Sequence, residues 1–265
     1  MNFREISLFK NFTEINIQKL SDEGEVLKFR PGQPMAFKAY IQNKVHIVLD
    51  GFARIVSKTS SDITLAKLGK GSIIGLASIL RAESCEEVFA SENVIALSIS
   101  DELAIHLYKE EKDFRKFCQQ SLFPGEIVDI TERLIENSLR SDIHFQSAFN
   151  LIFKSSKLKI IDKSDIFNFE KDKVHFISSA NFIDKSLGER LTKDIQLEVR
   201  PPFVGRIIEI PLKVFEEFEK ATPKPINPQN SNSSNNFSSV DKFAPIGNSK
   251  SGFDFGQYDN TKQKR

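Results

Sequence analysis

The segment VHIVLDGFARIV, residues 45–56, decides the fold class of this chain. Two strand-like runs flank Asp50-Gly51, a dipeptide that favours tight turns because glycine adopts a positive φ at little steric cost. Pro31-Gly32 gives a second turn signal after an alternating run, and residues 94–99 form a later apolar strand pattern. We therefore predict hairpins at both turns and an antiparallel β-barrel with flanking helices over residues 5–122.

Farther from this segment, a long helix and a second set of strands are predicted. Apolar residues on one face favour a helix over Glu126 to Asn137, a candidate homodimer contact. From about residue 141 the apolar period returns to two. Residues 206–220 repeat the strand-then-helix order of residues 94–109, which indicates an internal duplication. The predicted fold class is mainly β: a jelly-roll-like barrel followed by a smaller, barrel-like α+β domain.

The length of 265 residues favours two modest domains and a tail. We place the first barrel and its helices at 1–142 and the second, smaller domain at 143–221. Beyond that the composition shifts to proline, asparagine, serine and glycine. Such a segment buries too little apolar area to offset chain entropy, so residues 222–265 are predicted to be a disordered linker or tail.

Bulk composition excludes several classes of protein. Lys plus Arg (37) nearly balance Asp plus Glu (36), without the basic excess typical of nucleic-acid-binding proteins, so nucleic acid is not an expected partner. The two cysteines, Cys85 and Cys118, give no disulfide framework and fit a reducing compartment. The chain shows no signal peptide and no apolar run of about 20 residues. We expect a cytoplasmic protein with no direct membrane insertion, attached to the inner face of a membrane only through a partner.

Three motifs, in order, resemble the cyclic nucleotide-binding domain family. They are Phe29-Arg30-Pro31-Gly32, the segment 45–56 around Asp50-Gly51, and Leu68-Gly69-Lys70-Gly71-Ser72-Ile73-Ile74-Gly75. The resemblance covers about residues 5–122. It implies a barrel that holds its ligand with a short phosphate-binding segment, in which the first amides of a helix meet the cyclic phosphate.

The resemblance also implies that this pocket is degenerate. Where the family usually has a glutamate for the ribose hydroxyl, this chain has Leu76, and the position of the phosphate-binding arginine falls at Cys85 or Glu86. One lost charge-assisted hydrogen bond costs about 1.5–3 kcal/mol, and carboxylates facing a phosphate add repulsion of similar order. Together these terms weaken cAMP or cGMP binding roughly a hundredfold or more, so no cofactor is predicted. The expected pocket residues are Gly75, Leu76, Ala77, Ser78, Cys85, Glu86 and Glu87.

Arg81 is the nearby cation that can substitute as a phosphate partner, although the end of a short helix more often carries an exposed arginine. Cys85 is expected to be a small, partly buried residue, since reactive thiols lie among cations or at helix N-termini and this one precedes two glutamates. The pair Glu86-Glu87 is expected on a solvated turn.

No enzymatic chemistry is predicted. The sequence contains no phosphate-binding loop of the G-x-x-x-x-G-K-[ST] type, no Gly-x-Ser-x-Gly elbow and no kinase motifs. The histidines lack a second histidine or cysteine at metal-ligand spacing, so no metal is expected. These histidines are His46, His106, His144 and His175.

Three functional hypotheses remain. The first is a non-catalytic regulatory or interaction module whose partner is a protein or a membrane transporter domain. Its layout is similar to the cytoplasmic N-terminal region of bacterial ABC exporters for peptides that carry cyclic nucleotide-binding domains. The second is a functional sensor of a cyclic nucleotide or another small anion. The third, a transcription regulator of the same family, is disfavoured because strands rather than a basic recognition helix follow residue 141.

Overall fold

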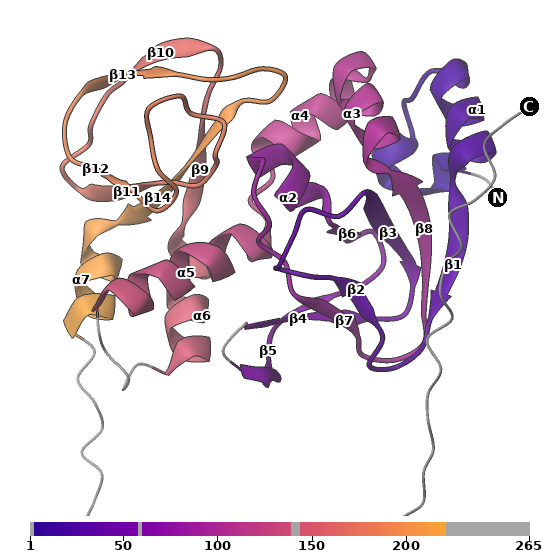
Figure 1. Cartoon of the computed structure of the whole chain (residues 1–265), viewed down its shortest axis with the longest axis horizontal. Helices are drawn as coiled ribbons and strands as arrows, with labels where there is room; N and C mark the ends of the chain where they lie inside the picture. The colour runs from indigo at the N-terminus through magenta and orange to yellow at the C-terminus, as the bar shows by residue number, and fades with distance from the viewer. Residues whose placement is uncertain (1–2, 58–59, 139–143, 221–265) are drawn as a thin grey trace, which may run out of the picture. The chain divides into compact units, whose positions relative to one another are not determined.

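The computed structural model describes residues 3–57, 60–138 and 144–220 (Figure 1). All of them belong to one compact unit that contains two β-barrels. The expected domain boundary at 142/143 and the expected tail at 222–265 both lie outside the described residues. None of the described helices is long and apolar enough to span a membrane.

The first barrel is built from two antiparallel four-stranded sheets. One sheet has the order β1-β8-β3-β6 and the other the order β2-β7-β4-β5. The predicted mainly β fold with flanking helices is confirmed. The strands are β1 (Glu25–Phe29), β2 (Pro34–Ala36), β3 (Lys44–Asp50), β4 (Ala53–Ser57), β5 (Ser60–Leu68), β6 (Ile73–Ile74), β7 (Val88–Ala90) and β8 (Val94–Ser100).

The two hairpins predicted at Pro31-Gly32 and Asp50-Gly51 were wrong. The strands on either side of each turn belong to opposite sheets: β1 pairs with β8 but β2 with β7, and β3 pairs with β8 but β4 with β7. Gly32 and Gly51 do adopt the positive φ of 80° that the turn signals implied. The glycines therefore set the position of each turn, while the packing of the two sheets determines which strands pair.

Short helices cover the first barrel, and one of them interrupts it. The helices η1, η2, α1, α3 and α4 form an apolar cluster with the residues on one face of β3 and β8. Helix α2 lies between β6 and β7 in the chain. The bounds are η1 (Phe3–Glu5), η2 (Ser7–Phe9), α1 (Glu14–Glu23), α2 (Leu76–Arg81), α3 (Asp101–Glu110) and α4 (Lys112–Gln120).

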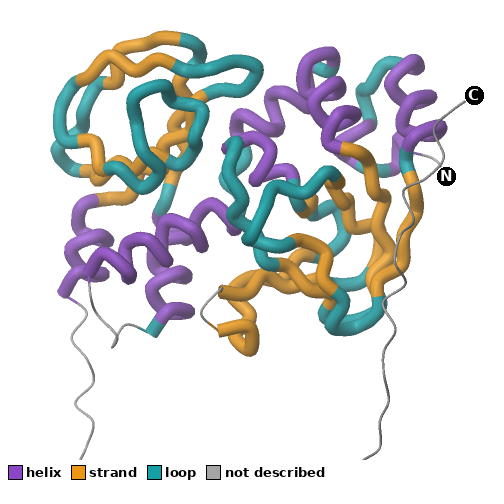
Figure 2. The backbone as a smooth tube through the Cα atoms, in the orientation of Figure 1, coloured by secondary structure: helices purple, strands orange, loops and turns teal. Residues whose placement is uncertain are grey.

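The second barrel repeats the topology of the first in reduced form (Figure 2). Its sheets have the orders β9-β14-β11-β12 and β10-β13, which match β1-β8-β3-β6 and β2-β7. Its described strands include no counterpart of β4 and β5, and no helix stands in the place of α2. The predicted shrunken duplicate is confirmed. Its strands are β9 (Lys157–Ile161), β10 (Ser164–Phe167), β11 (Lys173–Ile177), β12 (Arg190–Leu191), β13 (Ile195–Glu198) and β14 (Gly205–Pro211).

Three helices join the barrels: α5 (Pro124–Ser138), α6 (Phe145–Ser155) and α7 (Leu212–Lys220). One continuous apolar core runs from β4 and β7 through α5 and α6 to β11, β14 and α7. Residues 125–132 of α5 are all buried within the chain. A homodimer through residues 126–137 stays a prediction, and the described part of that helix exposes little beyond its last turns.

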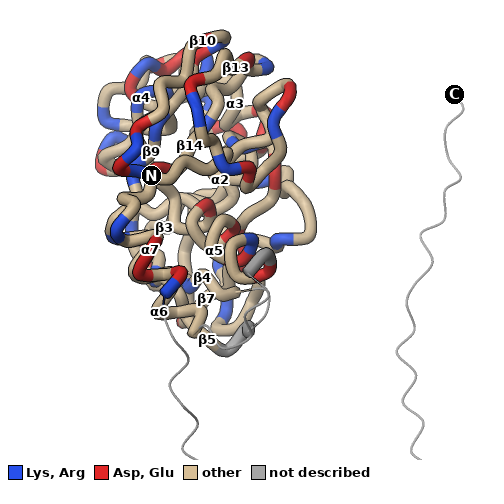
Figure 3. The backbone as a smooth tube through the Cα atoms, turned by 90° about the vertical axis from the view of Figure 1, so that its left-hand side faces the viewer, with Lys and Arg blue, Asp and Glu red and all other residues tan. Residues whose placement is uncertain are grey.

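Basic and acidic positions are intermixed along the chain (Figure 3). In this view the blue and red segments alternate over the strands of the second barrel instead of gathering in one stripe. The chain contains 37 basic and 36 acidic residues in total. That nucleic acid is not a partner stays a prediction.

Candidate functional site

The predicted phosphate-binding segment begins at a glycine that the backbone requires. Gly75 joins β6 to α2 with φ at 89°, a left-handed conformation that side chains disfavour. A Cβ atom added there would lie 2.8 Å from the carbonyl oxygen of Lys44. The turn places the Gly75 amide toward Glu86, in the segment that precedes β7.

The Gly75 amide is occupied by a carboxylate of the chain itself. Gly75 N–H donates a hydrogen bond of 2.8 Å to Glu86 Oε2. Glu86 is 2% exposed, so the expectation of a solvated turn was wrong. Burial raises the pKa of Glu86 to about 7, against the opposing effect of the Gly75 hydrogen bond, and nearby Glu126 raises it further. A backbone amide that an anionic ligand would use here already has a carboxyl oxygen of the chain as its partner.

The remaining pocket residues pack tightly around this contact. Leu76 and Ala77 are 1% and 0% exposed and belong to the apolar cluster of the first barrel. The Ser78 hydroxyl accepts from the Cys85 amide at 3.2 Å. Burial raises the pKa of Cys85 to about 12, so its thiol is protonated and a poor nucleophile. The Glu87 carboxylate does not join this contact; it accepts a hydrogen bond from the Lys38 amide at 2.9 Å.

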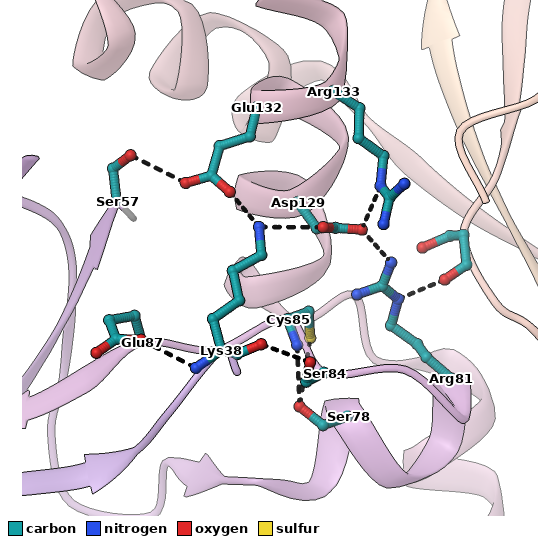
Figure 4. A network of polar contacts seen from close by, with 11 residues as sticks. Lys38, Ser57, Ser78, Arg81, Ser84, Cys85, Glu87, Asp129, Glu132 and Arg133 are labelled. Carbon is teal, nitrogen blue, oxygen red and sulfur yellow. Dashed lines mark hydrogen bonds and ion pairs between the residues drawn. The ribbon is translucent and has the colours of Figure 1, made fainter. Parts of the chain in front are cut away.

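Arg81 is fully buried, unlike the exposed arginine that is common at the end of a short helix. Its Nη2 donates to Asp129 Oδ2 of α5 at 2.7 Å, and its Nε donates to the carbonyl oxygen of Ser178 (Figure 4). Burial alone would raise the pKa of Asp129, but Arg81 and Lys38 lower it to about 2. Arg81 thus holds a carboxylate of α5 in this structure, and its role as a phosphate partner stays a prediction.

Asp129 lies at the centre of a larger ion-pair network (Figure 4). Lys38 Nζ lies 3.1 Å from Asp129 Oδ1 and also pairs with Glu132, while Arg133 Nε lies 3.0 Å from Asp129 Oδ2. The network connects the loop after β2, helix α2 and helix α5. Such buried charges depend on their partners, because removing one leaves another uncompensated.

A loop of the second barrel holds the C-terminal end of α2. Ala180 N–H donates to the Arg81 carbonyl at 2.8 Å, and Asn181 Nδ2 donates to the Leu80 carbonyl at 2.7 Å. This loop follows β11, at the place where the first barrel has β4 and β5. The reduced barrel therefore uses its shortened connection to satisfy helix-end carbonyls of the first barrel.

A second buried ion pair joins α5 to β14. Arg206 Nε and Nη2 donate to the two carboxylate oxygens of Glu126 at 2.9 and 2.5 Å, and both side chains are 1% exposed or less. Arg206 also donates to the carbonyls of Cys118 and Ser121. This pair could not be predicted from the sequence, since no local signal links residues 80 positions apart.

Gly125 limits the space around Glu86. A Cβ atom at Gly125 would lie 2.6 Å from Glu86 Cγ and 3.2 Å from the Cys85 carbonyl oxygen. We expect Gly125→Ala to lower the free energy of unfolding by about 1–3 kcal/mol, as overpacking of a buried site does. Urea unfolding would measure this, with Glu136→Ala at an exposed position of the same helix as the control. An unchanged midpoint for Gly125→Ala would contradict the tight contact.

No family model matches the sequence, and no curated protein matches it. Solved structures give distant likenesses. A putative cyclic nucleotide-binding protein from Geobacter metallireducens is 14% identical, with a TM-score of 0.37 over 44% of this chain and 86% of that one. The catabolite activator protein of Thermus thermophilus is 19% identical, with a TM-score of 0.35 over 50% and 60%. The cAMP-bound PfPKA-R (141–441) is 12% identical, with a TM-score of 0.37 over 82% and 81%.

Proposed function

We propose that this chain is a non-catalytic regulatory or interaction module in which an internal carboxylate has replaced an anionic ligand. The hydrogen bond from Gly75 N–H to the buried Glu86 carboxylate carries this proposal. A cyclic phosphate at the same amide would have to displace the Glu86 carboxyl group. The ionised form of Glu86 would also repel the phosphate, because like charges in a poorly solvated site repel strongly. The apolar side chain of Leu76 offers no acceptor for a ribose hydroxyl.

The contacts of Arg81 support a role in joining domains. Within one short helix, the Gly75 end is bonded to Glu86, and the Arg81 end is bonded to α5 and to the loop after β11. Any movement of α2 would break bonds to both the linking helix and the second barrel. In this proposal the first barrel acts as a fixed scaffold that presents the two-barrel unit to a partner.

The proposed partner is a protein, and the ABC-type peptide exporter suggested by the family resemblance is the specific candidate. The presence of a second, reduced barrel with the strand order of the first supports a tandem regulatory region of this kind. A catalytic role has little support at the site, because Glu86 accepts from a backbone amide and the Cys85 thiol is protonated.

Thermal stabilisation by cAMP tests the proposed replacement. We expect the unmodified chain to show no rise in Tm at about 1 mM cAMP, since stabilisation requires ligand near or above its Kd. Glu86→Arg removes the competing carboxylate and supplies a phosphate partner. We expect this variant to gain roughly 2 °C or more with cAMP. Adding Leu76→Glu restores an acceptor for the ribose hydroxyl and should increase the shift, although burying that carboxylate lowers the starting Tm.

Glu83→Arg is the matched control, because it makes the same charge change three positions away and should gain no cAMP response. Micromolar cAMP or cGMP binding by the unmodified chain would overturn the proposal and establish the sensor hypothesis. If folded Glu86→Arg and the double variant both fail to respond to cAMP, Glu86 does not stand in for a phosphate.

A further inference from the structure

The second barrel gathers two carboxylates and a histidine from three places in the chain. Glu170 follows β10, His175 lies in β11, and Glu209 lies opposite His175 in the register of β14. One ligand atom from each of the three lies within 4.8 Å of the other two. His175 Nε2 is 3.5 Å from Glu209 Oε1. No metal was expected from the sequence, because His175 has no second histidine or cysteine at metal-ligand spacing.

Three buried atoms of this cluster have no hydrogen-bond partner among the described residues. His175 is 0% exposed, and neither of its ring nitrogens has a hydrogen-bond partner among the described residues. Glu209 Oε1 is also buried without such a partner. The His175 ring makes T-shaped contacts with Phe167 and Phe169, with ring centroids 5.0 and 5.6 Å away. Buried polar atoms without hydrogen bonds are rare and cost about 1–3 kcal/mol each, so they call for a ligand.

The spacing suits a tetrahedral cation bound by nitrogen and oxygen. Zinc binds histidine and carboxylate ligands at about 2.0–2.2 Å, which places neighbouring tetrahedral ligand atoms about 3.3–3.5 Å apart. The distance of 3.5 Å from His175 to Glu209 meets this requirement. Glu170 has a side chain 42% exposed, in a turn, and can close the remaining gap by about 1 Å. Mg²⁺ prefers oxygen ligands and water to an imidazole.

Two lysines hold the carboxylates at present. Lys173 Nζ lies 2.6 Å from Glu170 and 3.4 Å from Glu209, and Lys159 Nζ lies 3.8 Å from each of them. Their side chains are 26% and 30% exposed, so each can turn its ammonium group into solvent. A divalent cation would therefore compete with these lysines for the same oxygens, and removing a lysine should strengthen its binding.

We propose that Glu170, His175 and Glu209 form a site for a divalent transition-metal cation of the zinc type. A bound ion would connect the turn after β10 to β11 and β14 across the interior of the second barrel. Its fourth position would be filled by water, as in three-ligand sites.

Titration of the full 265-residue chain with ZnCl₂, after removal of metal with a chelator, tests the proposal. We expect one equivalent to bind with a Kd of about 1 µM or tighter by calorimetry. CoCl₂ should give the visible absorption of a four-coordinate nitrogen and oxygen site. Glu209→Gln and His175→Gln should each weaken zinc binding by at least about tenfold. Substituting the groups that only hydrogen-bond to metal ligands already lowers metal affinity by about that much.

Two further variants separate a built site from other zinc contacts. His144→Gln, at an exposed histidine, should leave the Kd unchanged. Lys173→Gln should tighten zinc binding by about threefold to tenfold, because it removes a cation that competes for the carboxylates. This variant keeps all three proposed ligands, so it still tests the site if a ligand variant fails to fold. The proposal is overturned if the unmodified chain binds less than one equivalent. It is also overturned if Lys173→Gln weakens binding, or if His144→Gln weakens it as much as the ligand variants.

Discussion

Arg206→Met is expected to lower the free energy of unfolding by about 3–5 kcal/mol, the cost of removing one member of a buried ion pair. The guanidinium of Arg206 donates to both oxygens of Glu126 and to the carbonyls of Cys118 and Ser121. Methionine fills much of the volume but leaves the Glu126 charge buried without its cation. Arg206 lies in the second barrel and Glu126 in α5, so the ion pair connects these two parts. We expect the variant to unfold in a single urea transition, at a lower midpoint than the unmodified chain.

The exposed Arg30→Met is the control, and its expected effect is within about 0.5 kcal/mol. A double variant provides the stronger check. Glu126→Gln removes the charge while keeping an oxygen that can accept from the Phe123 amide, a bond of 3.2 Å in this structure. Combined with Arg206→Met, it should recover part of the loss, since no uncompensated charge remains. A loss below about 1 kcal/mol for Arg206→Met alone would show that the pair contributes little.

The barrels were predictable because their strands carry a local signal. Alternating apolar residues and turn dipeptides indicated the antiparallel fold, and the repeated strand-then-helix order of residues 94–109 and 206–220 indicated the duplication that the strand orders confirm. The pairing of the strands was harder to predict from the sequence. The Asp50-Gly51 turn carries a hairpin signal, yet its two strands join different sheets, because pairing is settled by contacts far along the chain.

The buried charges were not predictable for the same reason. A glutamate pair before a strand and an arginine at a helix end are more often exposed than buried. Arg81 is buried because the carbonyl of Ser178, 97 positions away, and the carboxylate of Asp129 meet it. His175 and Glu209 likewise come together through the register of β11 and β14. The family resemblance placed Cys85 or Glu86 at the position of the phosphate-binding arginine, but the bond from Gly75 to Glu86 could not be predicted.

The pH dependence of stability should reveal the buried carboxylate of Glu86. Its pKa is raised from 4.5 to about 7 in the folded chain, chiefly by burial. The folded chain therefore binds a proton more tightly than the unfolded chain between these values. The stability that this proton contributes is fully present below about pH 4.5 and is lost as the pH rises through 7. At about 1.4 kcal/mol per pKa unit, the loss from Glu86 approaches 3 kcal/mol.

Glu86→Gln should remove this component, because an amide can still accept from Gly75 N–H and does not ionise. We expect the stability of Glu86→Gln, relative to the unmodified chain, to rise by up to about 3 kcal/mol from pH 5 to pH 8. Urea unfolding at several pH values would measure the difference. Glu126 and Arg81 are the charged residues that act on Glu86, and both are unchanged in this variant. Their own contributions to the pH dependence therefore largely cancel in the comparison. Glu83→Gln controls for the loss of one negative charge, and its relative stability should stay level. A level profile for Glu86→Gln as well would contradict the prediction, because it would mean that Glu86 ionises as it does in water despite its burial.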